Sequence, residues 1–193
     1  MKENKYDDNI FFQKYSQMSR SQKGLAGAGE WETLKKMLPD FKGKRVLDLG
    51  CGYGWHCIYA MEHGASSVVG VDISHKMLEV AKEKTHFPQV EYKCCAIEDV
   101  EFPEESFDVI LSSLAFHYVA DYEILVKKIY RILKSGGKLV FTVEHPVFTA
   151  YGTQDWHYNE KGEILHFPVD NYYYEGKRTA VFLGEKVTKY HRT

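Results

Sequence analysis

The stretch Arg45–Tyr59, RVLDLGCGYGWHCIY, combines an apolar strand, a glycine-rich turn and the first turns of a helix. The apolar run before the turn is typical of a strand that is buried on both faces of a parallel sheet. Gly50, Gly52 and Gly54 remove side chains where the chain turns sharply, so that a ligand can approach the backbone. Backbone N–H groups point outward at a helix N-terminus, which makes this turn a site for a polar or anionic ligand.

The composition is that of an ordinary globular domain. A chain of 193 residues is large enough to bury a sizeable core as one domain. Lys and Arg number 25 against 27 Asp and Glu, so nothing in the charge supports nucleic-acid binding or a polybasic membrane patch. The N-terminus lacks the apolar core of a signal peptide, and no apolar run is long enough to span a bilayer. We therefore expect a cytoplasmic protein.

The cysteines match neither a zinc-binding spacing nor a disulfide framework. Cysteine commonly behaves as a small buried apolar residue. We therefore expect all four to be buried, namely Cys51, Cys57, Cys94 and Cys95.

Strands and helices alternate along the chain. The apolar patterns predict strands at 46–49, 67–71, 90–95, 107–112 and 138–143, and helices at 30–38, 55–63, after Ser74 and after Asp121. Residues 19–21 and 24–29 are predicted to be loops, and Ser135-Gly136-Gly137 is predicted to close the helix that follows Asp121. Such alternation predicts a doubly wound α/β domain with a Rossmann-like parallel sheet.

Polar residues follow each predicted strand, at 48–54, 72–73, 95–98, 112–117 and 144–145. In a doubly wound sheet the ligand lies beyond the carboxyl ends of the strands, so these segments are expected to converge. Dinucleotide enzymes favour G-x-G-x-x-G, whereas here Asp48 precedes three glycines that alternate with other residues. That carboxylate would repel a pyrophosphate but suits an ammonium and a sulfonium. Asp72 ends the next strand, where a carboxylate can accept ribose hydroxyls, although both acids could instead cap loops.

Four stretches, VLDLGCGYG, VVGVDIS, AIEDVEFPEESFDVILSSLAFHYV and LKSGGKLVFTVEHPVF, resemble in order the motifs of class I S-adenosylmethionine-dependent methyltransferases. The resemblance is closest to the small-molecule, type 11-like branch and covers Tyr6 to Phe148. It implies S-adenosyl-L-methionine as cofactor and S-adenosyl-L-homocysteine as product.

The resemblance implies a role for each strand end. Asp72 corresponds to the ribose-binding acid, Asp48 lies near the methionine ammonium, residues 96–98 border the adenine and residues 114–117 line the methionine side. The implied cofactor contacts are Tyr15, Met18, Arg20, Asp48, Gly50, Cys51, Gly52, Gly54, Asp72, Ile73, Met77, Ala96, Ile97, Glu98, Leu114, Ala115 and His117.

Two further features come from the resemblance. Many relatives carry Asp at the position of Cys95, so the adenine amino group would be bound here by Glu98 or by backbone carbonyls. The N-terminal FFQKYSQMSRS resembles the aromatic cap that closes over the cofactor, with core packing as the alternative role of its side chains. Trp55 is expected to pack rather than to bind.

Methyl transfer from a sulfonium needs alignment, exclusion of water and, for a protonated nucleophile, a base. It requires no metal, and no metal-ligand spacing stands out. His117 and His145 follow strands that end beside the cofactor, so both are candidate bases, with a structural role as the alternative. The expected substrate is a small molecule methylated at N or O, or at C. The alternatives are a non-catalytic S-adenosylmethionine-binding protein and a nicotinamide-dependent oxidoreductase.

Residues 146–193 alternate apolar and polar side chains with many aromatics, which predicts short antiparallel strands. Relatives insert a substrate-covering element here and then complete the sheet. We expect one domain over 1–193, with a helical cap at 1–40, a cofactor-binding core at 41–145 and this insert at 146–193, the C-terminal part being incomplete. The sheet would have five parallel strands, and its edge would be open or covered by a second copy in a homodimer.

Overall fold

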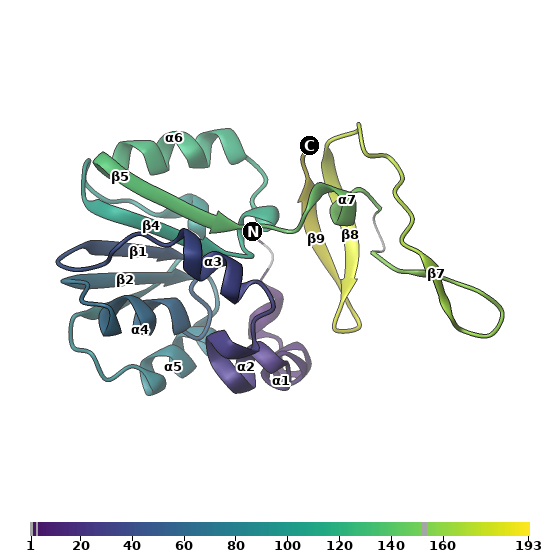
Figure 1. The fold of residues 1–193 in the computed structure, drawn as a ribbon, viewed down its shortest axis with the longest axis horizontal. Coiled ribbons are helices and arrows are strands. Elements are labelled where there is room, and N and C mark those ends of the chain that lie inside the picture. Colours follow the sequence, from purple (N-terminus) through teal and green to yellow (C-terminus); the bar gives the residue numbers. More distant parts are fainter. Residues whose placement is uncertain (1, 3, 152–153) are drawn as a thin grey trace.

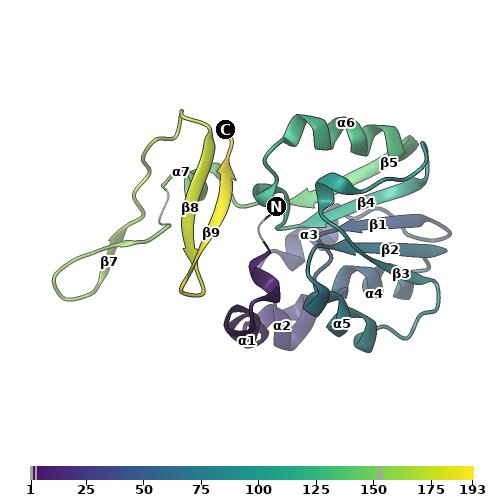
Figure 2. The same ribbon diagram turned by 180° about the vertical axis from the view of Figure 1, so that it is seen from behind.

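The computed structural model describes residues 2, 4–151 and 154–193. A parallel sheet in the order β3-β2-β1-β4-β5 runs through the centre of the molecule, with helices on both faces (Figures 1 and 2). Its strands are β1 (Arg45–Leu49), β2 (Ser67–Asp72), β3 (Val90–Cys94), β4 (Phe107–Ser113) and β5 (Leu133–Thr142). The predicted doubly wound, Rossmann-like fold is confirmed.

Alternate residues of each strand face two separate cores. Val46 packs with Leu78 on one side of the sheet, and Leu47 packs with Ile129 on the other. Because both faces are covered, the central strands β1, β2 and β4 are mostly apolar and buried, whereas the edge strands β3 and β5 carry more polar, exposed residues. The covering helices are α3 (Trp31–Met37), α4 (Trp55–Glu62) and α5 (His75–Lys84) on one face and α6 (Tyr122–Ile132) on the other.

The predicted helix end at 135–137 and the predicted loop at 19–21 are wrong. Residues 135–137 lie within β5, where pairing with β4 begins at Leu133, breaks, and resumes at Lys138 opposite Val109. Gly136 has a φ of +74°, so the glycines make this segment an irregularity inside a strand rather than a loop. Residues 19–21 lie in helix α2 (Ser19–Lys23). The non-helical residue between α1 and α2 is Met18, whose backbone is extended.

The expectation that all cysteines are buried is also wrong. Cys51 and Cys57 are buried, whereas Cys94 is exposed and Cys95 is partly exposed. β3 lies at the edge of the sheet, where fewer neighbours cover its side chains.

The N-terminal cap consists of η1 (Lys5–Asp7), α1 (Asn9–Ser16), α2 and η2 (Gly24–Gly27), followed by α3. Asp8 caps α1 by accepting hydrogen bonds from the backbone of Ile10 and Phe11. Asp7 accepts hydrogen bonds from the Ser74 hydroxyl at 2.6 Å and from the Lys76 backbone at 3.1 Å. The cap is thereby fixed to the first turn of α5.

The chain after β5 forms α7 (Pro146–Ala150) and two antiparallel pairs, which confirms the predicted antiparallel appendage. β8 (Gly176–Phe182) and β9 (Glu185–His191) form a hairpin beside the carboxyl ends of the central strands (Figure 1). β6 (His157–Tyr158) and β7 (Ile164–His166) form an arm that projects away from the sheet (Figure 2).

The cap and the β8–β9 hairpin touch each other. Phe11 of α1 packs with Ala180 and Val187 of the hairpin in a small apolar cluster, which we call the roof cluster. The rings of Phe11 and Phe182 lie 5.7 Å apart, and Lys14 donates a hydrogen bond to the Leu183 carbonyl at 2.9 Å. Both covers therefore meet over the same edge of the sheet.

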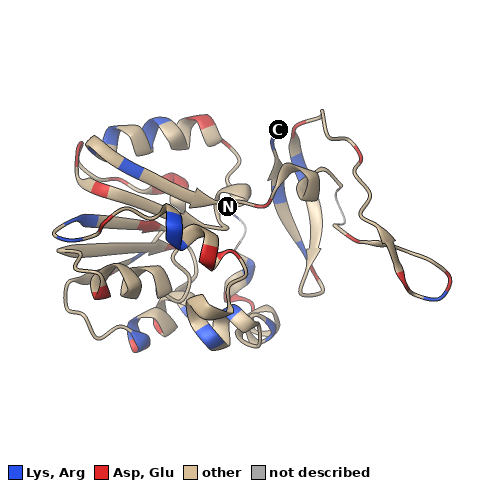
Figure 3. Ribbon diagram, viewed as in Figure 1, with Lys and Arg blue, Asp and Glu red and all other residues tan. Residues whose placement is uncertain are grey.

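Positive and negative side chains are interspersed on the strands, the helices and the hairpin (Figure 3), in keeping with a net charge of −2. Within the described ranges, no helix has the length and apolar character needed to cross a membrane.

The roof cluster generates a stability prediction. Phe11→Ala removes a fully buried ring, so we expect the free energy needed to detach the β8–β9 hairpin from the cap to fall by about 3 kcal/mol. Amide hydrogen exchange in β8 and β9 should accelerate roughly 100-fold, with little change in β1. Ile10→Ala is the matched control, because Ile10 is 60% exposed. Equal exchange in Phe11→Ala and wild type would show that the cluster does not hold the hairpin.

Candidate functional site

The three glycines of the turn after β1 are required for different reasons. A Cβ on Gly50 would lie 2.5 Å from the Ala115 methyl, and one on Gly54 would lie 2.2 Å from the Tyr92 hydroxyl. A Cβ on Gly52 would meet nothing within 4 Å. Gly52 therefore borders open space, whereas Gly54 is held by packing against β3.

Asp72 braces this turn from the end of β2. One of its oxygens accepts a hydrogen bond from the Gly52 backbone and the other from the Ser74 backbone, each at 2.9 Å. Burial raises the pKa of Asp72, and these two N–H groups oppose that effect. A carboxylate oxygen can accept more than one hydrogen bond, so Asp72 retains capacity for a ligand hydroxyl.

Asp48 is a buried acid with an unpaired atom. Its side chain is 1% exposed; Oδ2 accepts a hydrogen bond from the Cys57 thiol at 3.4 Å, and Oδ1 has no partner among the described residues. Burial raises the pKa of Asp48 to about 7; the Cys57 hydrogen bond opposes this, and the nearby charge of Asp72 adds to it. A buried acceptor without a donor is costly, and a cationic ligand group would relieve that cost.

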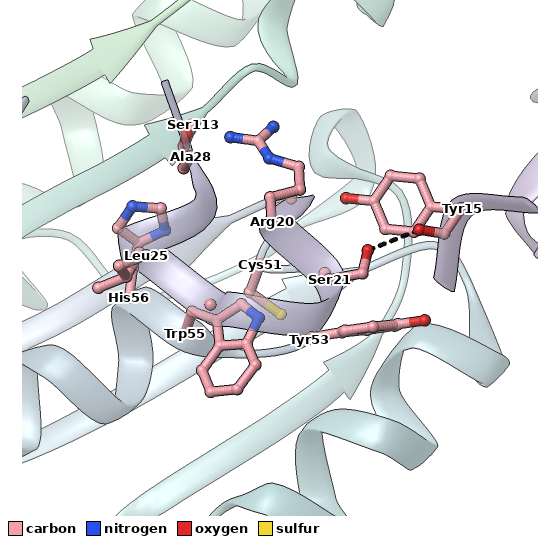
Figure 4. Close-up of a pocket in the computed structure, with 13 residues that line it drawn as sticks. Tyr15, Arg20, Ser21, Leu25, Ala28, Cys51, Tyr53, Trp55, His56 and Ser113 are labelled. Carbon is pink, nitrogen blue, oxygen red and sulfur yellow. Dashed lines mark hydrogen bonds between the residues drawn. The ribbon is translucent and has the colours of Figure 1, made fainter. Parts of the chain in front are cut away.

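A pocket lies between the glycine turn and the cap (Figure 4). Gly24, Trp55 and His56 are among its lining residues, and Trp55 packs its ring against Gly24. The indole N–H of Trp55 is buried and has no partner among the described residues. The expectation that Trp55 only packs is therefore incomplete, because the side chain also lines the pocket.

Arg20 enters this pocket from α2 and is held by an ion pair with Glu30. The Ser113 hydroxyl, at the end of β4, donates to the same Glu30 oxygen at 3.1 Å. Burial lowers the pKa of His56 to about 4, and Arg20 lowers it further while Glu30 opposes the shift. Glu30 thus links the cap to the sheet. Sequence reasoning missed this role because the partners of Glu30 lie 10 and 83 residues away in the chain.

The predicted cofactor residues fall into three groups. Tyr15, Arg20, Gly50, Cys51 and Gly52 line the pocket. Ile97, Ala115 and Asp72 lie against the glycine turn. The remaining positions are not among the residues that line the pocket: Met18, Asp48, Gly54, Ile73, Met77, Ala96, Glu98, Leu114 and His117.

Several of these outer positions already have structural roles. Met77 is 2% exposed, and its backbone donates to the Ser74 hydroxyl at 3.1 Å. The Leu114 backbone adopts a φ of +52° and donates to the Thr142 carbonyl at 2.9 Å. Glu98 is partly buried and lies 3.8 Å from Lys2.

The two candidate bases differ in surroundings. His145 is exposed and caps α7, because its Nδ1 accepts a hydrogen bond from the Val147 backbone at 3.1 Å. His117, in η4 (Phe116–Tyr118), is 5% exposed and lies 3.9 Å from Glu144. Burial lowers the pKa of His117 to about 4, which Glu144 opposes and Lys189 reinforces. Lys189 was missed by sequence reasoning, since it lies in a hairpin 45 residues after Glu144.

The strand order, the glycine turn and the acid after β2 define a Rossmann-like cofactor-binding domain of the methyltransferase type. Residues 47–141 match a family model described as a methyltransferase domain. A solved structure from Mesorhizobium loti, an S-adenosylmethionine-dependent methyltransferase, is 42% identical, with a TM-score of 0.81 over 88% of this chain and 77% of that chain. A Listeria monocytogenes protein assigned to the same family is 59% identical, with a TM-score of 0.82 over 86% and 78%.

The chain therefore belongs to the S-adenosylmethionine-dependent methyltransferases, and S-adenosylmethionine is its cofactor. An uncharacterized protein of Haemophilus influenzae is 36% identical over 97% of this chain and 77% of its own length. The ubiquinone biosynthesis O-methyltransferase of Coxiella burnetii is 37% identical over 57% of this chain, which spans 47% of that enzyme.

The glycine turn generates a paired prediction. In Gly54→Ala the new methyl clashes with the Tyr92 hydroxyl, and residue 54 keeps a φ of +74° that alanine disfavours. The free energy of unfolding should therefore fall by at least about 2 kcal/mol. Gly52→Ala adds backbone strain of about 1–2 kcal/mol without a clash, but its methyl fills the open space and should weaken cofactor binding. Chemical denaturation and calorimetry with S-adenosylhomocysteine measure both effects.

Tyr92→Phe provides the control for this pair. It removes the hydroxyl that a methyl at position 54 would meet. Combined with Gly54→Ala, Tyr92→Phe should therefore restore part of the lost stability, whereas combined with Gly52→Ala it should restore none. Equal rescue of both variants would contradict the assignment of Gly54 to packing.

Proposed function

We propose that this methyltransferase acts on a small molecule and transfers the methyl group to one of its oxygen or nitrogen atoms, with carbon as a further option. The carrying observation is the roof cluster, through which the cap and the β8–β9 hairpin meet above the carboxyl ends of the strands. An acceptor that reacts beneath two joined covers must be small, because a folded macromolecule has no room there. The similarity to an O-methyltransferase of ubiquinone biosynthesis supports an oxygen acceptor.

The residues at the glycine turn fit the cofactor. The unpaired Oδ1 of Asp48 suits the ammonium group of the methionine moiety, and the oxygens of Asp72 suit the ribose hydroxyls. Arg20 lines the pocket and would offer a cation to the carboxylate of the methionine moiety. We assign residues 96–98 to the border of the adenine, because Ile97 lies against Gly50 of the glycine turn. Gly54 and Met77 support this site from behind through packing.

When bound, S-adenosylmethionine supplies a methyl group on a cationic sulfur, which is open to in-line attack. The chain itself aligns the methyl acceptor with the cofactor and excludes water from the site. Tyr15 and Arg20 line the pocket from the cap side and contribute to this exclusion. His117 and His145 are the two candidate bases. Burial lowers the pKa of His117 to about 4, so the imidazole is neutral at pH 7 but a weak proton acceptor, and Nδ1 of His145 accepts a hydrogen bond in capping α7. His145 is exposed to solvent.

The proposed function can be tested by a methyl-transfer screen. The full chain is incubated with methyl-labelled S-adenosylmethionine and fractions of a cell extract separated by size, and products are followed by mass spectrometry. We expect label in the small-molecule fraction with wild type and none with Asp72→Asn, which weakens a ribose contact. Label found only in protein or RNA would overturn the small-molecule proposal.

Asp48 generates a pH-dependence prediction. Because folding raises the pKa of Asp48 to about 7, protonation stabilises the free protein at low pH, and this stabilisation is lost as the pH rises through about 7. A bound ammonium favours the ionised carboxylate, so binding below pH 7 should release a proton. Cofactor affinity should rise about tenfold per pH unit between pH 5 and 6.5 and then level off.

Calorimetry in buffers of different ionisation enthalpy measures this proton release directly. Asp48→Asn should bind more weakly at pH 8 and lose the pH dependence between pH 5 and 7. An unchanged pH dependence in that variant would show that another group titrates on binding.

A further inference from the structure

Arg20 is the only positively charged side chain among the described residues that line the pocket at the glycine turn. Burial lowers the pKa of His56, which also lines the pocket, to about 4, so that imidazole is neutral at pH 7. The same set of lining residues contains no Asp or Glu. An anionic group bound in this pocket would therefore form its ion pair with one guanidinium.

The backbone that carries Arg20 is fixed by its surroundings. Ser21 is 7% exposed, and its hydroxyl donates a hydrogen bond to the Tyr15 carbonyl at 2.7 Å. A Cβ on Gly27 would lie 2.2 Å from the Ser19 carbonyl oxygen, so η2 packs closely against the start of α2. The long Arg20 side chain keeps its own rotatable bonds, and fixing such a side chain when a ligand binds costs conformational entropy.

Glu30 restrains that side chain. Its Oε1 accepts hydrogen bonds from Arg20 Nη2 and from the Ser113 hydroxyl, the latter at 3.1 Å. The Thr142 hydroxyl in turn donates to Ser113 at 3.2 Å. Because Ser113 and Thr142 end β4 and β5, a chain of hydrogen bonds fixes the Glu30 carboxylate to the sheet independently of Arg20. The Arg20 and Glu30 side chains are 24% and 23% exposed, so the pair is largely shielded from water.

The Glu30 carboxylate lies outside the space that a ligand would occupy. Arg20 and Ser113 are among the residues that line the pocket, whereas Glu30 is not. The Arg20 guanidinium extends toward Ser113 at the end of β4 (Figure 4). A guanidinium carries five N–H donors in a planar fork, and Glu30 is the one acceptor that the described residues give Arg20. The other N–H groups are therefore open to a ligand.

We propose that Glu30 is a positioning residue, which orients Arg20 to bind the carboxylate of the cofactor's methionine moiety and so makes the site selective for ligands that carry this carboxylate. The inference rests on the cofactor contacts of the proposed function and deepens them. An arginine fork binds a carboxylate best through two parallel hydrogen bonds, which require the plane of the guanidinium to be set. Glu30 sets that plane from the side opposite the ligand.

The charge state of Glu30 agrees with this role. Burial alone would raise its pKa, but the hydrogen bond from its own backbone N–H and the charge of Arg20 together lower it below the ordinary value. Glu30 is therefore ionised at pH 7 and can hold a guanidinium. The neutral His56 imidazole lies on the same side of the pocket and adds no charge that would compete for Glu30.

Two alternative roles of Glu30 predict different results. If Glu30 only anchors the cap, its removal weakens the binding of every ligand by the same factor. If Glu30 competes with the ligand for Arg20, its removal strengthens the binding of ligands with a carboxylate. Positioning predicts the opposite sign, namely a loss of affinity confined to ligands with a carboxylate.

The test compares two ligands by calorimetry on the full chain. They are S-adenosylhomocysteine and its decarboxylated form, which keeps the adenosine, the sulfur and the ammonium. Wild type should bind S-adenosylhomocysteine roughly 100-fold more tightly than the decarboxylated form, and Arg20→Gln should bring the two affinities within about threefold of each other. Glu30→Gln should lower the affinity ratio roughly tenfold, and the double variant Arg20→Gln/Glu30→Gln should match Arg20→Gln, because Glu30 acts through Arg20.

Two further variants complete this test. Glu32→Gln is the matched control, because it makes the same change at an exposed residue of α3 and should leave the ratio unchanged. Ser113→Ala removes one support of Glu30 while both charges stay, and should lower the ratio about threefold. It decides the question if Glu30→Gln does not fold. A ratio in Glu30→Gln equal to or above that of wild type, an equal loss for both ligands, or an unchanged ratio in Ser113→Ala with Glu30→Gln unfolded would overturn the proposal.

A kinetic measurement follows once the methyl-transfer screen has identified an acceptor. Glu30→Gln should raise the KM for S-adenosylmethionine roughly tenfold and leave kcat within about twofold. The binding test needs no acceptor, so it remains informative if no small molecule is methylated and the proposed function fails. If a small molecule is methylated but wild type binds both ligands equally, only the role of Glu30 and Arg20 fails.

Discussion

The carboxylate of Asp72 is the contact on which the rest of the site depends. It bonds the backbone of Gly52 and that of Ser74, and so ties the glycine turn to the start of α5. The Ser74 hydroxyl in turn donates a hydrogen bond to the carboxylate of Asp7 in the cap. One end of β2 therefore positions the turn, the helix behind it and the cover above it.

The two covers depend on each other as well as on the sheet. The cap is attached through Asp7 and through the Arg20–Glu30 pair, and the hairpin is attached through the Glu144–Lys189 pair. Each attachment uses a charged group that is partly or fully withdrawn from water, where removal of one partner is costly. The apolar contacts of the roof cluster then join the covers directly.

Much of the fold follows from local sequence signals. Apolar runs buried on both faces, each ending in a polar residue, are sufficient to predict the parallel sheet and to bring Asp48 and Asp72 to one edge. The wrong predictions concern short polar segments, whose composition fits a loop as well as part of a helix or strand. Ser135-Gly136-Gly137 has the composition of a loop, yet pairing with β4 on both sides draws it into β5.

The site was less accessible to sequence reasoning, because its contacts are distant in the chain. Glu144 appeared among the strand-end residues, but its partner Lys189 lies in a hairpin whose register no local pattern sets. Likewise, Trp55 reads as a packing residue until the cap is folded over it, which leaves its indole N–H buried at the pocket.

Tyr92, which lies outside the glycine turn, restricts which side chains the turn can carry. Its hydroxyl fills the space beside Gly54, and its ring lies 2.7 Å from where a Cβ on Gly70 would be. Two positions, 54 in the turn and 70 in β2, are thus shaped by one aromatic side chain from β3. During divergence these positions should change together with Tyr92, because a small residue at 92 removes the closest contact at both. Ala81 still lies 3.2 Å from a Cβ at 54 and Cys51 lies 3.0 Å from one at 70, and the positive φ still favours glycine at 54.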